Sequence, residues 1–198
     1  MKQVSFLFIF FFVLTLSCSA QNETIYPEGL KAGDAAPAFS AKDQDGNKVS
    51  LKEMLKKGPV ILLFYRGQWC PYCNKQLASY TDSLQLIKQA GASVLAVTPE
   101  TPDNIRKTIE KTKASFPVIE DNELAIMKQY RVNFAVDEKT IARYKGYGID
   151  FTEANGSNGA NLPVPATYII GTDGKIKYVF FNTDYRRRVS VRELMENL

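Results

Sequence analysis

Two long apolar runs stand out along the chain. Residues 59–65 read PVILLFY, and residues 93–97 form a second run. Such runs suit strands that are buried on both faces, as in a parallel sheet. Residues 71–90 between them have a helical pattern that stops at Gly91, a residue type that often follows a helix C-terminus. The pattern therefore predicts a strand–helix–strand unit.

Turn and capping signals divide the rest of the chain. Asp-Gly pairs at 45–46 and 173–174 predict two hairpins. Ser50 and Ser190 each precede a Glu by three residues, which is the capping-box spacing of a helix start. The Asn- and Gly-rich residues 148–163 are expected to be a loop insertion. The remaining expected strands are 38–42, 47–50, 166–170 and 175–181, and the remaining expected helices are 102–113, 122–131 and 140–147.

The order of these elements predicts the fold class. Alternation of buried strands and helices indicates an α/β fold with helices on both faces of a central sheet, which the closing hairpin makes mixed. A strand–helix–strand unit followed by two antiparallel strands and a final helix is the arrangement of a thioredoxin-like fold, here with an N-terminal hairpin extension. Neither a repeat nor an internal linker is visible, so residues 30–198 are expected to form one domain.

Residues 1–20 have the pattern of a secretory signal peptide. Lys2 gives a positive start, and residues 6–16 are apolar but shorter than the roughly 20 residues of a membrane-spanning helix. Small residues at the end of the segment favour simple cleavage, whereas a loose lipobox would make Cys18 a lipid anchor. We therefore expect a protein that is secreted across the cytoplasmic membrane into the periplasm or the extracellular space. Attachment to the membrane is expected only if Cys18 is lipidated, and residues 21–29 are expected to be a polar tether.

The composition excludes several kinds of binding partner and catalytic site. The 198 residues carry a formal net charge of +4, an excess too weak to suggest a nucleic-acid partner. The absence of His excludes His-based triads and His metal ligands. With Cys18 in the leader, only Cys70 and Cys73 remain, too few for a structural zinc site of about four ligands. We expect no metal and no bound cofactor, and we assign the redox chemistry to sulfur.

Cys70 and Cys73 form a CxxC motif where a buried strand ends and a helix begins. Unpaired backbone N–H groups and the helix dipole stabilise an anion there, so a thiolate gains a lowered pKa and becomes a better nucleophile. Pro71 fits the first helical turn, where its missing N–H costs nothing. A redox-active pair is the favoured interpretation, and a permanent structural disulfide is the alternative. Trp69 and Tyr72 are expected to form an apolar rim around the dithiol, although Tyr72 could instead pack along the helix.

Residues 64–73, FYRGQWCPYC, resemble the active-site segment of peroxiredoxin-like proteins of the alkyl hydroperoxide reductase/thiol-specific antioxidant (AhpC/TSA) family, in the thioredoxin superfamily. Residues 32–39, 162–168 and 184–188 are similar to further segments of that family. The resemblance covers about residues 31–198. It implies a thiol-dependent peroxidase with an antioxidant role and an external thioredoxin-like electron donor.

The chain departs from the family signature P-x-x-x-T-x-x-C. The signature ends at Cys73, with Arg66 at its Pro position and Cys70 at its Thr position, and the family's peroxide-polarising Arg falls at Pro165. Pro165 instead matches the cis-proline that faces the CxxC motif in thioredoxins, with an ordinary trans Pro opening a strand as the alternative. Phe64 replaces the buried Asp of thioredoxins, so proton transfer would use another group, such as water.

Nearby arginines are candidate cations. Arg66 could stabilise a thiolate, or it could be a strand-end Arg that reaches solvent along an apolar surface. Arg186, Arg187 and Arg188 could bind an anion or form a solvated face.

Two assignments of the cysteines stay open. In a thioredoxin, Cys70 would be the exposed attacking thiol and Cys73 the resolving one. In a peroxiredoxin, Cys73 would attack peroxide and become a sulfenic acid, and Cys70 would condense with it to a disulfide. The expected function is peroxide reduction. The alternatives are a protein-disulfide reductase of thioredoxin type and a non-catalytic binding module with a structural disulfide.

Overall fold

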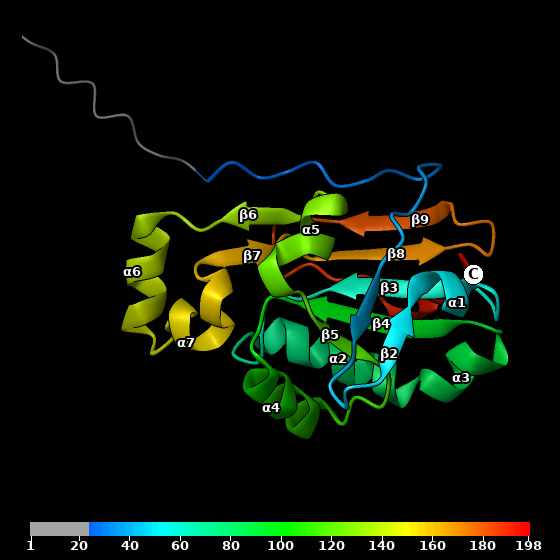
Figure 1. The fold of residues 1–198 in the computed structure, drawn as a ribbon, viewed down its shortest axis with the longest axis horizontal. Helices are drawn as coiled ribbons and strands as arrows, with labels where there is room; N and C mark the ends of the chain where they lie inside the picture. The colour runs from blue at the N-terminus through cyan, green and yellow to red at the C-terminus, as the bar shows by residue number, and fades with distance from the viewer. Residues whose placement is uncertain (1–23) are drawn as a thin grey trace, which may run out of the picture.

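The computed structural model describes residues 24–198, and the expected signal peptide lies outside these residues. A five-stranded mixed sheet of order β5-β4-β3-β8-β9 forms its centre (Figure 1). Strands β5, β4 and β3 are parallel to one another, β8 runs antiparallel to β3, and β9 runs antiparallel to β8 and so in the direction of β3. The sheet is therefore mixed, as predicted. The strands are β3 (Val60–Phe64), β4 (Ser93–Thr98), β5 (Val118–Glu120), β8 (Ala166–Ile170) and β9 (Ile176–Phe181).

Both faces of the sheet are buried. Successive side chains of β3 point to opposite faces. Ile61 and Leu63 pack into one apolar cluster, and Leu62 and Phe64 pack into the other. Helices cover both faces, as the alternating pattern predicts. One face carries α2 (Pro71–Asp82), α3 (Leu84–Gln89), α4 (Pro102–Thr112) and α8 (Val191–Met195), and the other carries α1 (Leu51–Leu55) and α5 (Ala125–Gln129).

The structure confirms most of the predicted turns and helix caps. An antiparallel hairpin of β1 (Ser40–Lys42) and β2 (Lys48–Ser50) forms the predicted N-terminal extension. Ser190 caps α8 through its side chain, whereas Ser50 precedes α1 without making a capping hydrogen bond. The single helix expected over 71–90 is wrong, because it breaks at Ser83 into α2 and α3.

The expected loop 148–163 is instead partly ordered into short elements. It contains α7 (Phe151–Asn155), a 3-10 turn η2 (Gly156–Asn158) and β7 (Asn161–Pro163), which pairs with β6 (Asn133–Ala135). Together with α6 (Glu138–Gly146), these elements gather at one end of the sheet (Figure 1). We call residues 133–163 the insertion. A further 3-10 turn, η1 (Asn122–Leu124), leads into α5.

The described part of the expected tether lies on the domain. The Thr24 hydroxyl donates to Asp137 Oδ2 at 2.7 Å, and the ring of Tyr26 meets that of Phe134 edge-on. Within residues 24–198, no helix is long and apolar enough to cross a membrane.

Candidate active site

The CxxC motif occupies the junction of β3 and α2, as predicted. Cys70 is the N-cap of α2, Pro71 is the first helical residue, and Cys73 lies in the first turn. The backbone N–H of Cys73 donates to Cys70 Sγ at 3.4 Å. Both cysteines are reduced and buried, with 1% of Cys70 and none of Cys73 exposed.

Several donors converge on the sulfur of Cys73. Arg188 Nη2 donates to Cys73 Sγ at 3.4 Å. Hydrogen bonding by the Cys70 side chain and the Arg66 backbone N–H also contributes to lowering the pKa of Cys73. Burial alone raises the pKa of Cys73, but these hydrogen bonds and the Arg188 charge outweigh burial and lower the pKa to about 6. Cys73 is therefore the more acidic thiol of the pair.

Cys70 holds the proton. Its pKa is raised because its thiol donates to Cys73 and because it is buried. A thiol with 1% exposure and a raised pKa is poorly suited to be the exposed attacking group of a thioredoxin. The raised pKa of Cys70 and the lowered pKa of Cys73 favour the assignment in which Cys73 attacks first.

The side chain of Arg66 lies among aromatic rings. It is 4% exposed, and its guanidinium lies 5.0 Å from the ring centroid of Trp69, 5.4 Å from that of Tyr144 and 4.4 Å from that of Tyr185. Arg66 Nη2 donates to the Tyr144 hydroxyl at 2.5 Å. Arg66 thus stabilises Cys73 through its backbone, while its side chain belongs to an aromatic cluster.

Trp69 and Tyr72, the two aromatic residues next to the cysteines, lie in different surroundings. Trp69 is half-buried and packs edge-on against Tyr144 and Phe151, which ties the active-site segment to the insertion. Tyr72 is 40% exposed and packs edge-on against Tyr185. Tyr72 therefore lies on the surface of α2.

The cis-proline expected at Pro165 is wrong. No peptide bond is cis within residues 24–198. The backbone N–H of Val164 donates to Val132 O at 2.8 Å, and Pro165 O accepts from Asn182 N at 3.3 Å. These bonds hold an extended chain that runs directly from β7 into β8, which is compatible with a trans proline at a strand start.

Two further residues, Arg188 and Glu100, belong to the site. The sequence did not single out Arg188 among its neighbours, and it did not identify Glu100. Arg188 was one of three arginines in a run, and only the fold shows which one reaches Cys73. Glu100 follows β4 and is fully buried. Its position just beyond a strand parallel to β3 was the available signal, because the carboxyl ends of neighbouring parallel strands meet at one edge of the sheet.

Glu100 supports the active-site segment. Its Oε1 accepts from the Gln68 backbone N–H at 2.6 Å, and its Oε2 accepts from the Thr108 hydroxyl at 3.2 Å. Burial raises the pKa of its carboxyl to about 7 despite these hydrogen bonds. A titratable acid therefore lies under the loop that carries the dithiol.

Comparison with known proteins finds a family and individual proteins that are similar to this chain. The profile of the AhpC/TSA family matches residues 32–179. Peroxiredoxin Bcp of Escherichia coli (strain K12) is 29% identical over 170 residues, which cover 85% of this chain and 97% of that protein.

Solved structures show the same fold. Peroxidoxin BcpB from Mycobacterium tuberculosis superposes with a TM-score of 0.61 at 24% identity, covering 77% of this chain and 86% of that one. The thioredoxin domain of a thiol-disulfide oxidoreductase from Bacteroides vulgatus gives a TM-score of 0.53 at 20% identity, covering 79% and 93%.

Proposed function

Because this chain belongs to the AhpC/TSA family, we propose that it reduces peroxides outside the cytoplasm through a Cys70/Cys73 dithiol–disulfide cycle. Its relatives support a thiol-dependent peroxidase, with a thiol-disulfide oxidoreductase as the other option. One observation carries the proposal: Arg188 Nη2 donates to Cys73 Sγ at 3.4 Å, in the first turn of α2.

The cycle has three steps. The Cys73 thiolate attacks the peroxide, the O–O bond breaks, and Cys73 becomes a sulfenic acid while the alkoxide leaves and takes up a proton. Cys70 then attacks the sulfenic sulfur, which forms the disulfide and releases water. An external thioredoxin-like dithiol reduces the disulfide and is itself oxidised. Since Cys70 and Cys73 are already hydrogen-bonded, condensation needs no distant segment to approach.

The residues around the dithiol have distinct roles in this cycle. Arg188 holds the attacking sulfur as an anion, and Cys70 keeps the proton until condensation. Pro71 starts the helix whose N-terminus faces the pair, and Trp69 packs the segment against the insertion. Pro165 is buried at the start of β8 and Tyr72 is exposed on α2, and neither takes a chemical part.

The extracytoplasmic location rests on the leader pattern of residues 1–20. Expression with and without these residues in a bacterial host, followed by separation of periplasm from cytoplasm, tests it. Export is expected only with the leader. Radiolabelled palmitate on the wild type but not on Cys18→Ala would establish a lipid anchor.

A protein-disulfide reductase is the second candidate, because CxxC at a helix N-terminus is the thioredoxin arrangement. The burial of Cys70 argues against it, since a protein disulfide must reach the attacking thiol.

Peroxide consumption coupled to thioredoxin oxidation tests the proposal. Turnover should vanish in Cys73→Ser and survive in part in Cys70→Ser with a small thiol as reductant. Fast reduction of a protein disulfide without peroxide turnover would favour the second candidate. Inactivity toward both substrates would indicate a binding module with a structural disulfide.

A further inference from the structure

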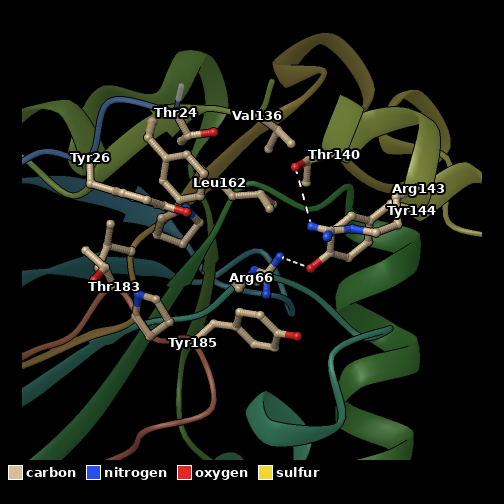
Figure 2. Close-up of a pocket in the computed structure, with 14 residues that line it drawn as sticks. Thr24, Tyr26, Arg66, Val136, Thr140, Arg143, Tyr144, Leu162, Thr183 and Tyr185 are labelled. Atoms are coloured by element: carbon tan, nitrogen blue, oxygen red, sulfur yellow. Dashed lines mark hydrogen bonds between the residues drawn. The ribbon is translucent and has the colours of Figure 1, made fainter. Parts of the chain in front are cut away.

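A pocket beside the active site carries a buried cation that lacks an anionic partner. The pocket has a volume of about 80 Å³, and Figure 2 shows Arg66 at its base between Tyr144 and Tyr185. Arg66 Nε and Nη1 are buried without a hydrogen-bond partner. None of the ion pairs found within residues 24–198 involves Arg66. Three aromatic faces offset only part of the cost of burying such a charge.

The pocket walls define what could complete this site. A second cation, Arg143, lies at the pocket, and none of the 14 lining residues is acidic (Figure 2). Most of the other walls are apolar or aromatic: Tyr26, Phe134, Val136, Leu162, Pro163, Val164 and Pro165. A ligand that suits both features has an anionic group and an apolar body. A carboxylate is the fitting anion, because its two oxygens match adjacent guanidinium N–H groups.

The pocket also adjoins the segment that carries the two cysteines. Arg66 lines the pocket with its side chain, and it lies in the segment between β3 and α2 that carries the two cysteines. A ligand held by the guanidinium is therefore bound to a residue of the active-site segment. Thr24 and Tyr26 form one wall of the pocket (Figure 2), and the enclosed shape favours a small molecule over a protein loop.

We propose that this pocket is a carboxylate subsite and that the preferred substrate is an organic hydroperoxide carrying a carboxylate. The substrate class rests on the peroxidase function proposed above. The hydroperoxide is reduced to the corresponding hydroxy acid while Cys73 is oxidised to the sulfenic acid. Arg66 binds and orients the carboxylate and takes no part in breaking the O–O bond.

Binding can be measured without any peroxide. Trp69 is the chain's one Trp and its ring lies against Arg66, so its fluorescence reports on the pocket. We expect 4-isopropylbenzoate to bind the reduced wild type at least about tenfold more tightly than the neutral 4-isopropylbenzamide, because a hydrogen-bonded charge distinguishes them. Arg66→Met should remove the difference, and Arg106→Met, which removes an exposed arginine of α4, should retain it. Equal affinities of the two ligands for the wild type would overturn the subsite.

Turnover then tests the substrate class. The kcat/KM for cumene hydroperoxide with a para-carboxylate should exceed that for cumene hydroperoxide at least about tenfold in the wild type and in Arg106→Met. In Arg66→Met the ratio should fall to about one. Equal kcat/KM values in the wild type would refute the substrate class. Failure of every hydroperoxide would refute the peroxidase function instead, and the benzoate measurement would still decide the subsite.

Discussion

Arg188 donates a hydrogen bond to the sulfur of Cys73 at 3.4 Å, across 115 positions of sequence. Its other terminal nitrogen, Nη1, donates to the carbonyl oxygens of Tyr185 and Arg187, so the chain that follows β9 fixes the guanidinium. The family's usual arginine position is occupied by Pro165, and this later arginine supplies a cation at the thiolate by another route.

Replacing Arg188 with Met should raise the pKa of Cys73, because the thiolate loses a cation and a hydrogen bond. We expect a rise of about one unit, the value of one modest charge-assisted hydrogen bond. The thiolate absorbance near 240 nm, followed against pH, measures it, with Cys73→Ser as the blank. Arg187→Met is the matched control, since that neighbouring side chain is exposed. Equal midpoints in the two variants would exclude Arg188 from this role.

Peroxide reactivity should follow the ionisation of Cys73. Burial raises the pKa of this thiol, but the donors around it lower the pKa to about 6, so the thiolate forms as pH rises through that value. The single-turnover rate with hydrogen peroxide, read from Trp69 fluorescence, should therefore rise between about pH 5 and 7 and level off above. A midpoint near the roughly 8.5 of an ordinary cysteine would contradict the site geometry.

Glu100→Gln should change how stability depends on pH. Burial raises the pKa of this carboxyl to about 7, so the folded state binds more protons than the unfolded state between the two pKa values. Wild-type stability from this group is present at low pH and is lost as pH rises toward 7 and beyond. The variant should lack that loss, and so gain about 1–3 kcal/mol on the wild type between pH 4 and pH 8. Urea unfolding at both pH values measures this. The exposed Glu110→Gln should show no such gain.

The insertion should depend on the packing of Phe151. Phe151 is 4% exposed, and its ring centroid lies 5.9 Å from that of Trp69. Phe151→Ala should cost about 3 kcal/mol and raise amide exchange over residues 133–163. Tyr147→Ala changes an aromatic of the same insertion that is 74% exposed, so it should stay within about 0.5 kcal/mol of the wild type. Similar losses in both variants would mean that the Trp69 contact does not hold the insertion.

Sequence pattern predicted the parts of the fold that rest on local signals. The runs at 59–65 and 93–97 became β3 and β4, and the dithiol stands where they predicted it. The order within 148–163 was not predictable, since α7 has five residues and no helical period to detect. Its start depends on Asp150, whose carboxylate accepts from two backbone N–H groups, and on packing against Trp69. The roles of Arg188 and Glu100 depend on contacts between distant segments, which no local pattern encodes.

Trapping of the sulfenic acid tests most directly that Cys73 is the residue that attacks peroxide. Cys70→Ser and Cys73→Ser are each treated with one equivalent of hydrogen peroxide and dimedone, and the adduct is located by peptide mass spectrometry. The account predicts an adduct on Cys73 in Cys70→Ser, no adduct on Cys70 in Cys73→Ser, and a Cys70–Cys73 disulfide in the wild type. An adduct on Cys70 in Cys73→Ser, with none on Cys73 in Cys70→Ser, would contradict it.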